Sequence, residues 1–367
     1  MNAVPGSEWE ARAPAALGLD ADALEAAAAY HQAHESPWPR DFITASGRYI
    51  GVEDEPLTSE VLGPVRPRGG PNGMIVRGGY VAAAWGDIDR ADMTFSVAKS
   101  YLAILAGLAS DRGLLRVDDP VRDTVRDGGF DGEQNRAITW RHLLQQTSEW
   151  QGTLWDKPDS IDHNRDVGKS ELGYAKKGER RVMRPPGTLW EYNDVRVNRL
   201  SLALLQVFRE PLGTVLRREI MDPIGAGATW EWQPYRNAWA EIDGRRMPSV
   251  PGGSHWGGGL WMSTRDHARF GLLVQRAGAW GARQIISRAW MDDVRRPCAL
   301  NPQYGLLWWL NTGRTSLPSA PASAFSARGA GSNVIYVDPE NDLTAVVRWI
   351  EKTSLDGFVK LVLAAVR

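Results

Sequence analysis

The stretch from residue 93 to residue 113 constrains the fold more than any other part of the chain. It begins Met-Thr-Phe-Ser-Val-Ala-Lys and continues as a run rich in alanine, leucine and isoleucine, without proline, as far as Gly113. This composition predicts a helix that is apolar on nearly every side and is therefore buried, with Gly113 placed to end it. We expect the rest of the chain to be organised around this helix.

Ser96 and Lys99 stand three residues apart at the head of this run. That spacing puts both side chains on one face of the first turns, where the positive end of the helix favours a serine oxygen that gains negative charge. Arginine greatly outnumbers lysine in the chain, and a buried amine can lose its proton whereas a guanidinium cannot. The pair therefore predicts a serine nucleophile with a lysine base. The alternative is a chance Ser-x-x-Lys in which Ser96 only caps the helix.

Composition limits the classes of partner. The 367 residues suffice for a large core and two subdomains, and a net charge of −1 with mixed charges predicts no nucleic-acid surface. Cys298 is the single cysteine, and no apolar run is long enough to span a membrane. The first residues lack the pattern of a signal peptide, so we expect a cytoplasmic protein of undetermined oligomeric state. His31 and His34 could share a helix face without completing a metal set, so we expect neither metal nor cofactor.

Strand signals occur near both ends of the chain and helix signals between them. Two hairpins are predicted. One has a Gly-Gly turn within residues 73–85, and the other has a Pro-Glu-Asn-Asp turn between 333–337 and 343–349. Helices are expected at 21–34, 102–110, 140–146, 197–208, 212–221, 265–276 and 355–366. The pattern predicts an α/β (α+β) fold: an antiparallel sheet flanked by N- and C-terminal helices, with an inserted mainly helical domain. We assign residues 1–92 plus 296–367 to the sandwich and 93–295 to the insert, and expect an exposed loop at 151–180.

Tyr192 lies in a second group of polar residues, after the rigid turn Pro185-Pro186-Gly187 and just before another apolar helix. Taken alone, it would most simply be a half-buried packing tyrosine. Together with Ser96 and Lys99, however, it could accept the serine proton and later return it to a leaving group. We therefore predict Ser96, Lys99 and Tyr192 as the catalytic residues.

Several segments in this order resemble the serine β-lactamase-like hydrolases. The similar branch comprises class C β-lactamases, D-alanyl-D-alanine peptidases, related esterases and 6-aminohexanoate-dimer hydrolases. The segments are Phe95-Ser96-Val97-Ala98-Lys99-Ser100, 114–121, 138–148, 186–192, 257–266 and 336–339. The resemblance covers most of the chain, and it implies the fold predicted above, with the site in the cleft between the two parts.

The chain departs from the family pattern at three places. Asp194 stands where the tyrosine motif usually has asparagine, and Glu149 replaces a common glycine. The third motif, normally lysine or histidine followed by threonine or serine and glycine, reads Ala327-Arg328-Gly329-Ala330. Arg328 could still supply a positive charge. The resemblance implies an oxyanion hole formed by the backbone N–H groups of Ser96 and Ala330, worth about 3–4 kcal/mol for one donor.

We therefore predict a serine hydrolase that cleaves a small-molecule ester or amide through a Ser96 acyl-enzyme, more like a carboxylesterase or amidase than an efficient β-lactamase. The alternatives are a β-lactamase or D-aminoacyl peptidase, an acyltransferase, and an inactive ligand-binding homologue. Tryptophan is abundant, and although most such rings pack in cores, some should wall the cleft. The predicted substrate-binding residues are Asp194, Arg328, Gly329, Trp155 and Trp256.

Overall fold

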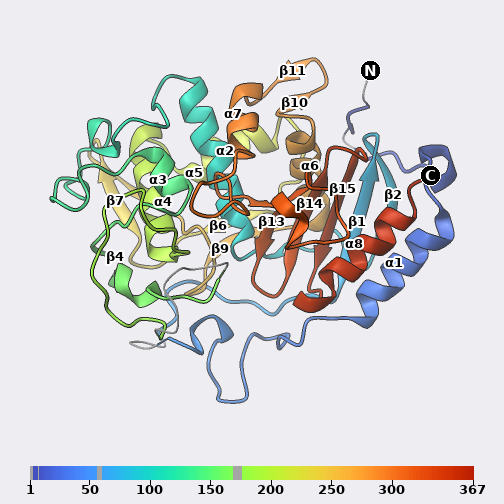
Figure 1. Ribbon diagram of the computed structural model, residues 1–367, viewed down its shortest axis with the longest axis horizontal. Helices are drawn as coiled ribbons and strands as arrows, with labels where there is room; N and C mark the ends of the chain where they lie inside the picture. Colours follow the sequence, from blue (N-terminus) through green and yellow to red (C-terminus); the bar gives the residue numbers. More distant parts are fainter. Residues whose placement is uncertain (1–2, 7, 56–59, 168–175) are drawn as a thin grey trace.

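A six-stranded antiparallel sheet formed by both ends of the chain dominates one side of the molecule (Figure 1). The computed structural model describes residues 3–6, 8–55, 60–167 and 176–367. The strand order is β12-β13-β14-β15-β1-β2. The strands are β12 (Trp309–Leu310), β13 (Phe325–Gly329), β14 (Asn333–Asp338), β15 (Leu343–Arg348), β1 (Asn72–Arg77) and β2 (Tyr80–Trp85). Both predicted hairpins are present, and β1 pairs with β15 to join the two ends of the chain.

Each face of this sheet is covered by helices because alternate strand residues point to opposite sides. Val334 and Tyr336 face one apolar cluster, whereas Ile335 and Val337 face the other. On the first face lie α1 (Ala21–Ala33) and α8 (Leu355–Ala364), side by side in Figure 1. On the other face α6 (Thr264–Gln275) packs against β1, β14 and β15.

The helix α2 (Val97–Asp111) lies between the sheet and the helical part of the chain (Figure 1). All its residues from Val97 to Ala109 are buried, as the apolar composition predicts. It contacts β13 and β14 on one side and other helices on the other. The surrounding helices are α3 (Trp140–Leu144), α4 (Asp194–Phe208), α5 (Leu212–Leu216), which a π-helical turn (Arg217–Met221) extends, and α7 (Arg288–Val294).

Smaller strands complete the helical part. A three-stranded sheet joins β3 (Asp92–Met93), β9 (Gly259–Met262) and β6 (Glu231–Gln233). Short hairpins pair β4 (Thr153–Leu154) with β5 (Lys157–Pro158), β7 (Trp239–Ile242) with β8 (Arg245–Pro248), and β10 (Ala279–Trp280) with β11 (Arg283–Gln284). The predicted fold class is confirmed. The boundaries at 93 and 295 stay a prediction, and α6, inside the predicted insert, packs on the large sheet.

The stretch 151–180 differs from the exposed loop that its polarity predicts. Its described part contains β4, β5 and the 3₁₀-helix η4 (Asp159–Asp162), and Asp159, Asp162 and His163 are buried. These polar side chains do not face water: Asp159 pairs with His163 and with the buried Arg196, and Asp162 with the partly buried Lys177. Residues 168–175 lie outside the described residues. Among the described residues, no helix combines the length and the apolar character that a membrane span requires.

Candidate active site

Ser96 lies at the entrance to α2, and its side chain does not cap that helix. The residue before it, Phe95, has a φ of 51°, a left-handed conformation that costs energy for a non-glycine residue. The Ser96 hydroxyl is half-buried and lies 2.8 Å from Lys99 Nζ. The structure therefore gives Ser96 a lysine partner, and the simple helix-cap alternative does not describe it.

Lys99 is buried, and its amine is surrounded by oxygen atoms. Nζ donates to Ser96 Oγ, to Asp194 Oδ1 at 2.5 Å and to the Gly252 carbonyl at 3.2 Å. Burial lowers the pKa of Lys99, and the Asp194 carboxylate opposes that effect. Gly253 belongs to the same segment, and a Cβ there would lie 3.3 Å from Nζ and 3.4 Å from Ser96 Oγ. The small residues 252 and 253 thus let this segment pass close to the serine.

Tyr192 is buried beside the same two residues. Its hydroxyl lies close enough to that of Ser96 for the two to interact, and Lys99 Nζ lies 4.9 Å from the centre of its ring. Burial raises the pKa of Tyr192 well above its usual range, while the Ser96 hydroxyl and the Arg165 charge act in the opposite direction. Trp309 stacks on the tyrosine ring at 5.9 Å between centroids. The structure therefore brings all three predicted catalytic side chains together.

Asp194 is part of this group and is only 4% exposed. Its Oδ1 accepts from Lys99, while its Oδ2 lies 2.5 Å from Arg165 Nη1 and 2.9 Å from His255 Nδ1. Burial alone would raise the pKa of Asp194, but Arg165, Lys99 and His255 hold it well below its usual range. The Asp194 carboxylate, predicted to contact substrate, instead binds the side chains of Lys99, Arg165 and His255.

The end of β13 runs along the backbone of Ser96. A Cβ on Gly329 would lie 2.3 Å from the Thr94 carbonyl oxygen and 3.2 Å from Ser96 N, so glycine permits this approach. The next residue, Ala330, is exposed, and its carbonyl accepts from Asn333 Nδ2 at 2.7 Å. The predicted oxyanion-hole residues Ser96 and Ala330 are therefore on adjacent segments.

Arg328 points to the other face of β13, because neighbouring strand residues alternate. Its Nε donates to Ser326 Oγ at 2.8 Å and its Nη1 to Ser316 Oγ at 2.7 Å. Burial lowers the pKa of Arg328 to about 10. The structure does not bring this predicted substrate anchor to Ser96.

The two predicted cleft tryptophans lie behind the charged group. Trp256 has no exposed surface and stacks on His255 at 4.3 Å between centroids. Trp155 is half-buried and meets Tyr235 edge to face at 5.6 Å. Trp309, stacked on the Tyr192 ring, is an aromatic neighbour of the catalytic side chains that the predicted substrate-binding residues did not include.

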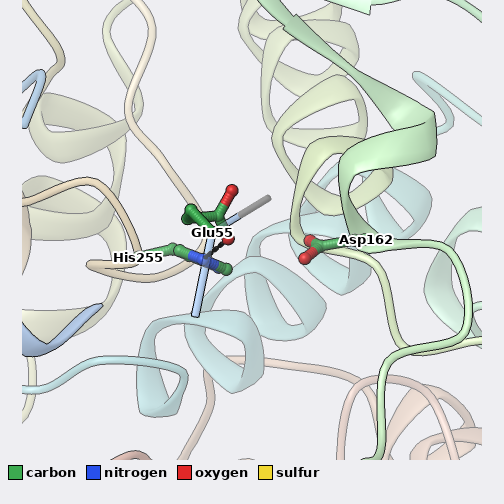
Figure 2. A group of neighbouring side chains, drawn as sticks. All are labelled: Glu55, Asp162 and His255. Atoms are coloured by element: carbon green, nitrogen blue, oxygen red, sulfur yellow. Dashed lines mark hydrogen bonds and ion pairs between the residues drawn. The ribbon is translucent and has the colours of Figure 1, made fainter. Parts of the chain in front are cut away.

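The sequence prediction also missed a set of buried charges behind Asp194. His255 Nε2 lies 2.6 Å from Glu55 Oε1, as Figure 2 shows, and Lys177 Nζ lies 2.5 Å from the same oxygen. Arg165 Nη1 lies 3.4 Å from Asp162 Oδ2. Glu55 and His255 are separated by 200 residues in the chain, so no local motif joins them. For Asp162, Arg165 and Lys177 the sequence signal is the polarity of 151–180, interpreted above as solvent exposure.

Glu55, Asp162 and His255 could in principle hold a metal ion, because their ligand atoms lie within 4.8 Å of one another. In Figure 2 Asp162 lies apart from the Glu55–His255 pair. The Lys177 ammonium lies between the two carboxylates, 2.5 Å from Glu55 and 3.7 Å from Asp162. Because Lys177 and Arg165 already balance these charges, we do not assign the three residues as metal ligands.

The order of the segments around this site decides the family. The sequence model of the Beta-lactamase family matches residues 89–354, which include Ser96, Lys99, Tyr192 and β13. The chain belongs to the Beta-lactamase family. No curated protein matches the sequence at a significant level.

Solved structures of Beta-lactamase-like proteins share the fold of this family member. EstCE1, described as a hydrolase with promiscuous acyltransferase activity, is 15% identical with a TM-score of 0.60, over 94% of this chain and 98% of its own. A penicillin-binding protein homologue from Caulobacter crescentus is 16% identical with a TM-score of 0.59, over 95% and 99%. A putative β-lactamase from Bacteroides dorei is 18% identical with a TM-score of 0.59, over 80% and 93%. At these identities the likeness shows the fold alone.

Proposed function

We propose that this Beta-lactamase family member is a serine hydrolase that cleaves an ester or amide bond through a Ser96 acyl-enzyme. One observation carries the proposal. The half-buried Ser96 hydroxyl is hydrogen-bonded to Lys99 and interacts with the buried Tyr192, at a helix entrance and beside the glycine edge of β13. A nucleophile, a proton acceptor and backbone donors for an oxyanion are the parts that acyl transfer requires.

The reaction follows from these positions. In the reactive form Tyr192 is a phenolate. Ser96 Oγ attacks the substrate carbonyl carbon, its proton passes to the phenolate oxygen of Tyr192, and the carbonyl oxygen becomes an oxyanion beside the N–H groups of Ser96 and Ala330. The tetrahedral intermediate then expels the alcohol or amine, which takes the proton back from Tyr192. Water attacks the acyl-enzyme by the same path, releasing the carboxylic acid and restoring the Ser96 hydroxyl.

The surroundings of Lys99 favour Tyr192 as the group that takes the first proton. Asp194 and the Gly252 carbonyl accept hydrogen bonds from Nζ, and Ser96 Oγ is the third partner. An ammonium group satisfies all three partners with its three donors, whereas a neutral amine has one donor fewer. Lys99 thus acts as a positive charge that favours the tyrosine phenolate and the incoming oxyanion.

An uncharged ester or linear amide is the proposed substrate class, because Arg328 is turned toward Ser316 and Ser326. Transfer of the acyl group to an alcohol is a second candidate, favoured by the acyltransferase activity named for EstCE1, a structural neighbour. Adding a primary alcohol to the ester assay and measuring the new ester against free acid separates the two.

Covalent labelling tests the proposal directly. A fluorophosphonate should add one adduct to the protein, located on the Ser96 peptide by mass spectrometry, and Ser96→Ala should remain unlabelled. Ser100→Ala is the matched control: Ser100 lies on the same helix, but its hydroxyl donates to the Leu307 carbonyl at 2.8 Å. Equal labelling of the Ser96→Ala protein would overturn the assignment.

A further inference from the structure

His255 has a carboxylate on each side of its ring. Its Nδ1 lies 2.9 Å from Asp194 Oδ2, and its Nε2 lies 2.6 Å from Glu55 Oε1. An ionised carboxylate only accepts hydrogen bonds, so both ring nitrogens must carry protons and the ring is an imidazolium. Burial and Arg165 lower the pKa of His255, but Asp162, Asp194 and Glu55 outweigh them and raise it.

The groups that face His255 come from several elements. Besides Asp194 on α4 and Glu55, they are Asp162 at the end of η4, Arg165 after it, and Lys177 from the segment that follows residue 175. Trp256 stacks on the ring, and Lys157 of β5 lies 5.5 Å from the Trp256 ring centre and interacts electrostatically with Glu55.

We name the ion-paired set around Asp194 the catalytic cluster. Its positive members are Lys99, Arg165, Lys177 and His255, and its negative members are Glu55, Asp162 and Asp194. With His255 as an imidazolium, the cluster has one positive group more than it has negative groups. Without that proton the two signs balance.

We propose that His255 is a positioning residue whose charge, held between Glu55 and Asp194, makes Tyr192 release its proton more readily and so sets the pH at which Ser96 becomes reactive. This inference rests on the proposed function. It goes beyond that function because it assigns a role to residues that do not touch substrate.

The link from His255 to Tyr192 runs through Asp194. Asp194 favours the protonated phenol, whereas Arg165, 5.4 Å from the Tyr192 ring centre, favours the phenolate. His255 donates to the Asp194 oxygen that Arg165 also binds, and so withdraws negative charge from the side facing the catalytic pair. Loss of the imidazolium would leave Asp194 less compensated, and a phenolate next to it would cost more energy.

The experiment measures how the rate of Ser96 labelling by a fluorophosphonate depends on pH. His255→Asn keeps an amide next to Asp194 but removes the positive charge. The acid limb of the labelling rate should therefore move up by about one pH unit. On that limb the variant should be labelled tenfold more slowly than the parent protein, and at high pH the two rates should be equal. Glu55→Gln removes a negative charge, so its acid limb should stay in place or move down. If the acid limb moves up in His255→Asn but not in Glu55→Gln, the charge of these two residues is the cause. A structural defect would instead slow labelling of both variants at every pH.

A spectroscopic titration gives a second readout that does not depend on turnover. The chain has nine tyrosines, so the phenolate absorbance of Tyr192 is obtained as the difference between the protein and its Tyr192→Phe variant. The titration midpoint of Tyr192 should be higher in His255→Asn than in the parent protein. His163→Asn is the matched control, because His163 is equally buried but pairs with Asp159 outside the catalytic cluster.

The outcomes are distinct. An unshifted acid limb in His255→Asn, or an equal upward shift in Glu55→Gln or His163→Asn, would overturn the inference while Ser96 labelling upheld the proposed function. Labelling that persists in Ser96→Ala would overturn the proposed function itself.

Discussion

Asp194 and Arg196 are two residues apart at the start of α4, yet they belong to two different buried charge networks. Asp194 is the centre of the catalytic cluster. Arg196 is the centre of a second network, here named the structural cluster, which contains Arg196, Arg181, Glu149, Glu191 and Asp159. Both networks consist of buried carboxylates paired with cations, and their central residues stand two and four positions after Tyr192.

The two networks differ in their charge balance and in their contacts. The structural cluster has more carboxylates than arginines, and apart from two bonds to the His163 side chain its further contacts include backbone groups, such as Arg196 Nε to the Trp150 carbonyl and Arg184 N to Glu149. The catalytic cluster has an excess of positive charge and reaches the half-buried hydroxyl of Ser96 through Lys99. Buried charge alone therefore does not mark an active site. Connection to an accessible nucleophile does.

The largest effect expected from this comparison is on stability. Arg196→Met removes a cationic partner of Glu149, Glu191 and Asp159, and breaking a buried pair in this way costs about 3–5 kcal/mol. Urea unfolding should show that loss, whereas Arg218→Met, at an ion pair whose arginine is 50% exposed, should cost less than about 1 kcal/mol. Similar losses in both variants would remove the distinction between buried and surface pairs.

The catalytic cluster should respond in activity. Lys99→Ala and Tyr192→Phe should each lower ester turnover by at least ~10²-fold, because each removes part of the path that takes the Ser96 proton. The double variant should be nearly as active as the slower single variant, since both residues serve one proton transfer. Near-full activity of Tyr192→Phe on ester and amide substrates would return Tyr192 to a packing role.

The fold and the centre of the site were predictable from local patterns. The apolar run after Ser96, the two hairpin turns and the helix signals each depend on neighbouring residues, and the structure confirms them. Glu55 and His255 were not predictable, because they meet only after folding and carry no shared motif. The prediction for Arg328 failed for a simpler reason. Neighbouring residues of a strand point to opposite faces, so Arg328 lies on the face of β13 opposite to the one on which Gly329 approaches Ser96.

The structural cluster should also lose stability in acid. Burial alone would raise the pKa of Glu149, but Arg181 and Arg196 lower it from 4.5 to about 2 in the folded chain. Glu149 therefore stabilises the fold above pH 4.5, and this contribution of about 3 kcal/mol disappears as the pH falls toward 2. The free energy of unfolding of the parent protein minus that of Glu149→Gln should shrink over this interval. A difference independent of pH would show that Glu149 acts through packing.

The smallest effect concerns substrate class and revises the role expected of Asp194. An ionised Asp194 would repel a substrate carboxylate, but Lys99, Arg165 and His255 neutralise it, so repulsion is not the reason to expect poor β-lactam turnover. The reason is Arg328, which hydrogen-bonds to Ser316 and Ser326 away from the serine. We expect kcat/KM for a short p-nitrophenyl ester to exceed that for nitrocefin by more than ~10-fold, about 1.4 kcal/mol in barrier. Arg328→Ala should leave that ratio unchanged, because the guanidinium does not reach the substrate. A nitrocefin rate at or above the ester rate would show that another cation of the catalytic cluster holds the carboxylate, and the chain would then be a β-lactamase in activity as well as in family.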